Sequence, residues 1–142
     1  MSAIYVDSSA ILRSQLEETG QDDARAILRS ADLHIGSRLV VVEVATGLAA
    51  AIRASRITPD RTADVQASTL ELLAALRAVE LTRGIADHAA SLGAQHALTG
   101  ADAIHLASAL AFGGDLVFTT WDQRLHCAAR AVGLRVAPAA LD

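Results

Sequence analysis

The sequence predicts an α/β fold in which helices cover both faces of a mostly parallel sheet of four or five strands. Short runs rich in β-branched and aromatic residues alternate along the chain with longer stretches at helical spacing. Strands that are separated by helices need crossover connections, which make the strands parallel. Runs such as AIYV and LVF are almost continuously apolar, as is typical of strands that are buried on both faces.

The elements follow one another with recognisable boundaries. Strands are predicted at residues 3–7, 33–36, 79–82, 116–120 and 134–137. Helices are predicted at residues 9–16, 22–31, 39–54, 60–77, 85–96, 102–112 and 122–132. Pro59 indicates the start of the fourth helix, because proline is favoured in a first helical turn. Gly113 and Gly114 end the sixth helix before the strand LVFTT, and Gly133 ends the seventh.

Length and composition fit a single domain over residues 1–142. The chain has 142 residues, of which 52% are hydrophobic, so it can bury a sizeable core. It contains no glycine, serine or proline stretch long enough for a linker, and no repeat. We therefore expect the whole chain to fold as one unit.

The N-terminal segment and the cysteine content indicate a soluble cytoplasmic protein. MSAIYVDSS lacks the basic start and long apolar run of a secretory signal. The longest apolar region, LVVVEVATGLAAAI, has 14 residues and is interrupted by Glu43, so it is too short to cross a bilayer. The single cysteine, Cys127, excludes an intrachain disulfide and a cysteine-rich zinc site. We interpret it as a helix residue that is buried or half-exposed.

The charged residues restrict the possible chemistry. All twelve basic residues are arginines, and the net charge is −4. Without lysine, a mechanism that needs a lysine nucleophile or a lysine on a phosphate is excluded. The negative balance argues against a nonspecific coat on nucleic acid, which depends on many cationic contacts to phosphate. Any contact with RNA must then be local, through a metal ion or a few arginines.

Two acidic residues follow predicted strands, where this kind of fold binds its ligand. In open α/β sheets the ligand lies at the carboxyl ends of the strands. Asp7 ends the first predicted strand, and Asp122 follows the fourth. Asp115 precedes the fourth strand and therefore belongs to the opposite edge, so we exclude it from the site.

The aspartates also have an ordinary structural explanation. Asp7 and Asp122 stand at strand-to-helix junctions, the latter in TWD after Thr120, where N-caps are common. Asp102 lies in the first turn of an apolar helix, TGADAIHLASALAFGG, where the helix dipole favours an acid. His105, three residues later, is expected to be buried or half-buried, or to act as a partner of Asp102.

In RLVVVEVATGLAAAI, Glu43 is flanked by three valines before it and by Val44 and Ala45 after it. Burial of an unpaired carboxylate costs several kcal/mol and raises its pKa, so a partner is expected to face Glu43. The structural alternative to a functional role is an internal salt bridge to Arg38 or Arg83.

Considered jointly, the acids predict a metal site at one edge of the sheet. At about 4 Å and an effective dielectric constant of about 20, each like-charged pair costs roughly 4 kcal/mol. A bound cation relieves this repulsion, and an all-oxygen site suits Mg²⁺ or Mn²⁺ better than zinc. Metal-bound water is a strong nucleophile near neutral pH, and the ion neutralises charge that develops on a phosphodiester.

Four segments, in order along the chain, carry a family resemblance: IYVDSSAIL, the helix with Glu43, DAIHLASAL and LVFTTWDQRL. Together they resemble a PIN domain, specifically a VapC-type toxin ribonuclease, over essentially the whole chain. The acidic quartet of the family matches Asp7, Glu43, Asp102 and Asp122. Its conserved hydroxyl matches Thr120, and Ser8 falls beside the first acid, where the family tends to have a small polar residue.

The resemblance implies a three-layer α/β/α fold and cleavage of RNA. Such a protein is a Mg²⁺- or Mn²⁺-dependent endoribonuclease that hydrolyses phosphodiester bonds with a metal-activated water held by the acidic quartet. It acts as the toxin of a VapBC-type toxin–antitoxin pair, and family members are commonly homodimers. By analogy, a VapB-type antitoxin lays an apolar segment over the early helices and inserts a basic residue into the acidic pocket.

Within this resemblance each site residue has an expected role. Asp7 and Asp122 bind the metal directly, and Asp102 completes the site directly or through water. Glu43 activates the attacking water or holds a second ion. Thr120 orients a carboxylate or a water, with helix capping as the structural alternative.

Two further residues near the fourth strand are candidates for RNA contacts. Arg124 is expected either to contact phosphate or to be a solvated helix residue. Trp121 is the candidate for stacking on a base, with core packing as the alternative.

Three other protein classes could have a similar pattern of acidic residues. A phosphoacceptor receiver needs a lysine after its last strand and paired acids after its first, whereas this chain has no lysine and reads DSS. A phosphatase with an aspartyl nucleophile needs a second acid two residues after Asp7, where this chain has Ser9. A PIN-like module that binds RNA or a partner without cleaving it remains the principal alternative.

Overall fold

The strands form one parallel sheet with β1 at its centre in the computed structural model, which describes residues 2–141. The strands are β1 (Ala3–Val6), β2 (Leu33–Ser37), β3 (Arg77–Val79), β4 (Leu116–Thr119) and β5 (Arg135–Ala137). Within these residues the sheet has five strands in the order β3-β2-β1-β4-β5, and every pairing is parallel. The predicted parallel sheet of four or five strands is confirmed.

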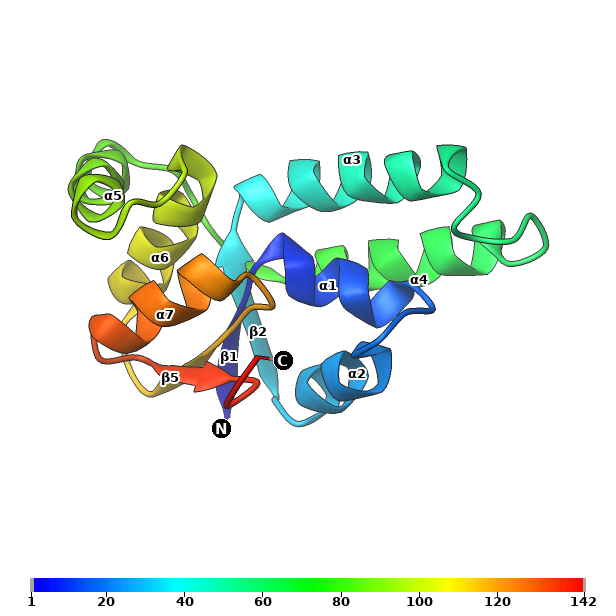
Figure 1. Ribbon diagram of the computed structural model, residues 1–142, viewed down its shortest axis with the longest axis horizontal. Coiled ribbons are helices and arrows are strands. Elements are labelled where there is room, and N and C mark those ends of the chain that lie inside the picture. Colours follow the sequence, from blue (N-terminus) through cyan, green and yellow to red (C-terminus); the bar gives the residue numbers. More distant parts are fainter. Residues whose placement is uncertain (1, 142) are drawn as a thin grey trace.

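Two layers of helices enclose the sheet, as Figure 1 shows. The first layer consists of α1 (Ser8–Gln15), α2 (Gln21–Arg29), α3 (Leu39–Arg53) and α4 (Thr62–Ala75). The second consists of α5 (Arg83–His96), α6 (Gly100–Phe112) and α7 (Gln123–Ala131). The three-layer α/β/α fold is confirmed.

The side chains of β1 alternate between the two cores because successive strand residues point to opposite faces. Ile4 and Val6 pack with α1, α2 and α3. Tyr5 faces α5, α6 and α7, is fully buried, and stacks on Phe118 with ring centroids 5.0 Å apart. Burial on both faces explains why every residue of β1 is apolar.

Helix α3 approaches α1 closely at Gly47. A Cβ atom at this glycine would lie 2.7 Å from Cδ1 of Leu12, so a larger side chain would require the end of Leu12 to move. Glu43 stands one helical turn before Gly47, on the same face of α3. The close approach of the helices therefore holds Glu43 near the carboxyl end of β1.

The observed boundaries differ from the predicted ones mainly around α4 and β3. Strand β3 spans residues 77–79 rather than 79–82, and α4 ends at Ala75 because Leu76 already has extended backbone. Pro59 lies in a turn three residues before α4 begins at Thr62. Gly133, with a φ of 92°, follows α7 in the left-handed region that favours glycine, as the sequence predicts.

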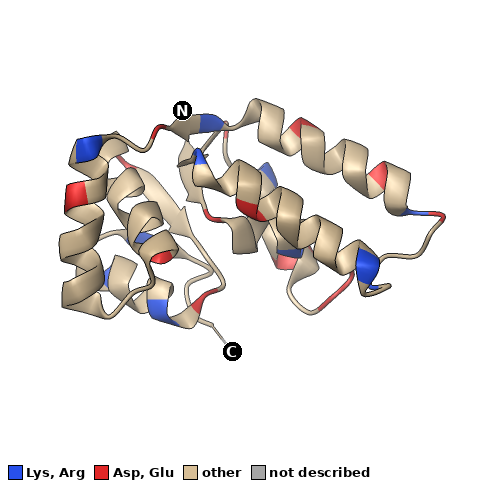
Figure 2. Cartoon of the chain, turned by 90° about the horizontal axis from the view of Figure 1, so that it is seen from above, with Lys and Arg blue, Asp and Glu red and all other residues tan. Residues whose placement is uncertain are grey.

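Acidic and basic residues are interspersed over the helices, as Figure 2 shows. Among the helices of residues 2–141, none has the length and apolar character needed to span a membrane.

Candidate active site

The site lies at the carboxyl ends of β1 and β4, the neighbouring strands at which the order of the sheet reverses. Open α/β sheets bind ligands in the crevice at such a switch point. Val6 is paired with Thr119 in the register of the two strands. The next residues, Asp7 and Thr120, therefore leave the sheet side by side.

Asp7 is a buried carboxylate with several hydrogen-bond donors. It is 3% exposed and caps α1, and its Oδ1 accepts from the backbone N–H of Ala10 at 3.0 Å and from the hydroxyl of Ser9 at 2.6 Å. Its Oδ2 accepts from the hydroxyl of Thr120. Burial raises the pKa of Asp7, although these hydrogen-bond donors act in the opposite direction. The carboxylate is thus held rigidly and partly stripped of water.

Ser9 and Thr120 join the start of α1 to the segment between β4 and α7. The oxygen of Ser9 accepts from the backbone N–H of Trp121 at 3.0 Å, and that of Thr120 accepts from the N–H of Asp122 at 3.0 Å. The family resemblance indicates Ser8, but Ser9 is the serine that contacts Asp7. Ser9 could have been identified from the sequence because it lies two residues after a capping aspartate. At this position a serine hydroxyl can donate a hydrogen bond back to the capping carboxylate.

Asp102 lies at the same edge because α6 leads into β4 and therefore begins where the parallel strands end. Thr99 caps α6, and its oxygen accepts from the backbone N–H of Asp102 at 3.2 Å. Burial, and then the neighbouring carboxylate of Asp122, raise the pKa of Asp102, and Asp7 adds to the effect. These three carboxylates therefore share one electrostatic environment.

Asp122 caps α7, which is the structural role predicted for it from the sequence. Its Oδ1 accepts from the backbone N–H of Leu125 at 2.8 Å, and the residue is half-buried. A cap uses one carboxylate oxygen, so the other can still bind a cation.

The partner of Glu43 is a histidine rather than an arginine. Oε1 of Glu43 lies 2.6 Å from Nε2 of His105, and the exposed fractions of the two side chains are 28% and 1%. Arg38 instead pairs with Glu80 on the exposed surface, and Arg83 pairs with an aspartate of its own helix. The structural alternative of a salt bridge from Glu43 to Arg38 or Arg83 is therefore wrong, because both arginines point to solvent.

His105 is buried, as predicted, but its hydrogen bonds go to residues other than Asp102. Its ring reaches Glu43 through Nε2 and the hydroxyl of Tyr5 through Nδ1, at 2.9 Å. Asp102 stays at the half-buried start of the helix, whereas His105 is one turn deeper in the core.

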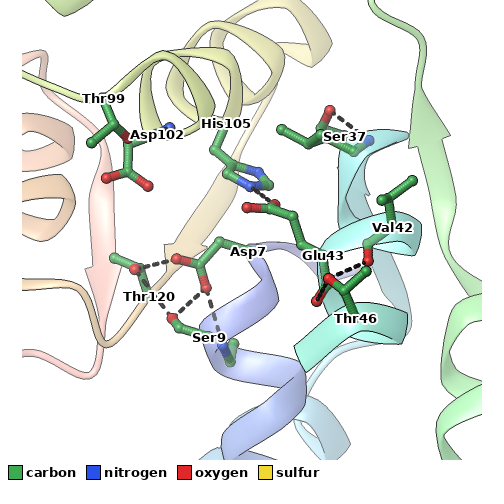
Figure 3. Close-up of polar contacts among 12 residues, drawn as sticks. Asp7, Ser9, Ser37, Val42, Glu43, Thr46, Thr99, Asp102, His105 and Thr120 are labelled. Atoms are coloured by element: carbon green, nitrogen blue, oxygen red, sulfur yellow. Dashed lines mark hydrogen bonds and ion pairs between the residues drawn. The ribbon is translucent and has the colours of Figure 1, made fainter. Parts of the chain in front are cut away.

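Figure 3 shows the carboxylates of Asp7, Glu43 and Asp102 pointing from three elements into one space beside His105 and Thr120. Over residues 2–141, however, no three His, Cys, Asp or Glu side chains are close enough together to hold one metal ion. The acids thus surround a common space without a formed set of ligands. Assignment of the quartet to a metal stays a prediction.

The residues around this space fit a hard divalent cation. The available donors are carboxylate and hydroxyl oxygens, which Mg²⁺ and Mn²⁺ prefer. Burial is the main cause of the raised pKa of Asp102, and the negative charges of Asp122 and Asp7 add to it. A cation in this space would reverse that effect.

Other residues named in the sequence analysis lie outside this space. Asp115 is exposed, pairs with Arg135 and directly precedes β4, so its predicted position at the opposite edge of the sheet is confirmed. Cys127 is exposed on α7 rather than buried or half-exposed. It follows two inward-facing residues of an amphipathic helix, Leu125 and His126, and falls on the outer face.

Trp121 and Arg124 already have contacts within the protein. Trp121 is half-buried, with the guanidinium of Arg13 5.5 Å from its ring centroid. Arg124 is exposed and donates to the backbone carbonyl of Ala97 at 3.3 Å. Both contacts are consistent with the structural alternatives given for these residues.

Comparison with known proteins connects the site to a family. The profile of the family described as PIN domain matches residues 4–130. Ribonuclease VapC45 of Mycobacterium tuberculosis (strain CDC 1551 / Oshkosh) is 46% identical over 143 residues, which cover 100% of this chain and 99% of the relative. Ribonuclease VapC49 of strain ATCC 25618 / H37Rv gives the same values.

Solved structures share the fold at lower sequence identity. The crystal structure of PAE2754 from Pyrobaculum aerophilum has a TM-score of 0.67 and 21% identity, and the match covers 96% of this chain and 92% of that one. A chain of a toxin–antitoxin complex from Klebsiella pneumoniae has a TM-score of 0.64 and 15% identity, covering 99% and 100%.

Proposed function

The chain belongs to the PIN domain family, with VapC-type relatives along its whole length, and from this we propose that it is an endoribonuclease acting as a toxin. In this proposal it hydrolyses phosphodiester bonds within RNA. The main observation behind the proposal is that the carboxylates of Asp7, Glu43 and Asp102 point into one space at the β1/β4 edge. The name ribonuclease of two relatives at 46% identity supports it.

We propose Mg²⁺ or Mn²⁺ as the cofactor, held by Asp7, Asp102 and Asp122 with Glu43 as the fourth acid. When bound, the cation supplies an activated water and neutralises charge that develops on the scissile phosphate. The oxygen donors of this edge suit such an ion. In this proposal Thr120 acts on the metal site by fixing Oδ2 of Asp7.

In the proposed reaction Glu43 takes up a proton from the attacking water. The hydrogen bond from His105 uses Oε1 of Glu43, which leaves Oε2 for the water. At 28% exposure the side chain is accessible to solvent and substrate yet partly desolvated.

As partner we propose a VapB-type antitoxin, with the chain itself a homodimer in the cytoplasm. The Klebsiella pneumoniae chain that shares this fold belongs to a toxin–antitoxin complex, which supports such a partner. An apolar groove of about 570 Å³ between α3 and α4, which includes Leu48, Ile52, Leu70 and Leu73, offers a seat for an apolar segment. Leu70 is 67% exposed, so this groove is open to a partner.

Cleavage assays with matched variants test the proposed activity. We expect the wild type to cut a mixture of single-stranded and structured RNAs with Mg²⁺ or Mn²⁺, and to stop in EDTA. Asp7→Asn should reduce the rate about tenfold to a hundredfold or more, because it removes a charged oxygen at the metal. Asp115→Asn, at the opposite edge, serves as the control and should cut like the wild type.

Two results would count against this function. Equal cleavage by the wild type and Asp7→Asn would separate the activity from this site. RNA that binds to the wild type but stays intact with either cation would favour the alternative of a PIN-like module that binds without cleaving.

A further inference from the structure

A chain of hydrogen bonds runs from the end of β2 through the core to Glu43. The backbone N–H of Ser37 lies 3.0 Å from the hydroxyl oxygen of Tyr5, which lies 2.9 Å from Nδ1 of His105. Nε2 of the same ring lies 2.6 Å from Oε1 of Glu43. Ser37, Tyr5 and His105 are at most 1% exposed. The chain thus connects β2, β1, α6 and α3, and Figure 3 shows its last step.

The donors and acceptors along this chain are compatible with one direction of hydrogen bonding. The N–H of Ser37 can only donate, so the oxygen of Tyr5 accepts from it. The hydroxyl of Tyr5 has one hydrogen, which it can donate to Nδ1 of His105 at 2.9 Å. A neutral imidazole that accepts at Nδ1 carries its hydrogen on Nε2. The hydrogen on Nε2 therefore points at Glu43.

We propose that Tyr5 and His105 are positioning residues that select one imidazole tautomer and thereby fix the orientation of Glu43. Ser37 aligns Tyr5, Tyr5 sets the tautomer of His105, and His105 fixes Oε1 of Glu43. The second oxygen, Oε2, is then directed to the space that Asp7 and Asp102 face. The inference rests on the proposed nuclease function for its effect on rate, whereas the tautomer is a property of the protein alone.

A second buried histidine provides the matched control. His126 is 3% exposed, and its Nε2 lies 2.8 Å from the backbone carbonyl of Pro138, so the hydrogen bond of its ring involves none of the acids. A merely structural role for His105 predicts that equivalent changes at the two histidines have equivalent effects. The positioning role predicts that only changes at His105 alter the reaction.

The tautomer is measured by long-range ¹H–¹⁵N NMR of the histidine rings in metal-free protein at neutral pH. We expect His105 to carry its hydrogen on Nε2 and to accept a hydrogen bond at Nδ1. Tyr5→Phe keeps the ring on Phe118 but removes the hydroxyl, so the Nδ1 resonance of His105 should move toward that of a free imine nitrogen. The His126 resonances should not change.

The effect on Glu43 is measured as a kcat and KM comparison on one RNA. We expect His105→Leu to lower kcat about tenfold to a hundredfold, the range found for residues that orient the ligands of a metal. KM for RNA should stay unchanged, because the buried ring cannot touch the substrate. His105→Gln keeps a donor near the position of Nε2 and should recover most of the lost kcat, and His126→Leu should leave kcat unchanged.

Three results would overturn the inference: a hydrogen on Nδ1 of His105 in the wild type, an Nδ1 resonance that Tyr5→Phe does not move, or equal kcat losses for His105→Leu and His126→Leu. A wild type that cuts no RNA would overturn the proposed nuclease function instead. In that case the NMR spectra of wild type and Tyr5→Phe still decide the tautomer. They also decide it if His105→Leu fails to fold.

Discussion

Asp7 combines two demands that conflict at the level of a single residue. Its side chain is 3% exposed, yet it accepts hydrogen bonds from Ser9, Ala10 and Thr120 that favour the charged form. Burial outweighs these donors and raises the pKa of the carboxyl group. The folded protein without a cation therefore binds this proton more tightly than the unfolded chain does.

This conflict predicts a pH dependence of stability in EDTA. The stabilisation by the proton on Asp7 is complete below the ordinary aspartate pKa of about 4, and it is lost as the pH rises through the raised pKa. We therefore expect the free energy of unfolding to fall over that window, and Asp7→Asn to reduce the fall. Urea denaturation across this pH range gives both profiles. Parallel profiles for the two proteins would show that burial of Asp7 has no such effect.

At the residue scale, the sequence predicted the acids but few of the contacts among them. Asp7, Asp102 and Asp122 could be found because each stands at a junction between elements. Ser9 was missed because its bond to Trp121 spans 112 residues and depends on the register of β1 and β4. Tyr5 in an apolar strand gives no sign that its hydroxyl reaches α6.

Among the elements, helix α6 positions Asp102, an acid of the site, in its first turn. Thr99 caps it by accepting from the backbone N–H of Asp102 itself. The cap therefore fixes both the first turn and the acid on it.

We predict that Thr99→Ala destabilises the protein by about 1 kcal/mol, the usual cost of losing an N-cap. Thr99→Ser keeps the accepting oxygen and should retain most of the stability. Urea denaturation of the three proteins measures the difference. Equal destabilisation by alanine and serine would mean that the lost methyl group, and not the cap, is responsible.

Strands and helices were predictable in kind and order because each carries its own periodicity or cap. The least accurate element was β3, which begins two residues earlier than predicted. It has three residues at the edge of the sheet and pairs only with β2 among the described strands. Its position depends on the register with Ile35 and Ser37, which periodicity in a short segment does not reveal.

At the scale of the whole molecule, the sheet order creates the site. Placing β1 beside β4 brings together Asp7 and Asp122, which are 115 positions apart in the chain. The order β3-β2-β1-β4-β5 could not be read from the sequence, since parallel strands joined by helices can be arranged in several ways.

The shared space between the acids predicts stabilisation by cations. An ion that binds only the folded protein at a concentration of 100 Kd adds about 2.7 kcal/mol to the free energy of unfolding. Millimolar Mg²⁺ should therefore raise the melting temperature, and Asp7→Asn should reduce the rise. Differential scanning fluorimetry with Asp115→Asn as the control measures it. A rise of equal size in Asp7→Asn would place the ion elsewhere.

Anomalous X-ray diffraction from crystals soaked in Mn²⁺ shows whether these distant acids meet around one cation. We predict one or two anomalous peaks within ligand distance of the carboxylates of Asp7, Asp102 and Asp122. Anomalous peaks only at other acids, such as Asp115, with none beside Asp7, would show that these acids do not share a cation.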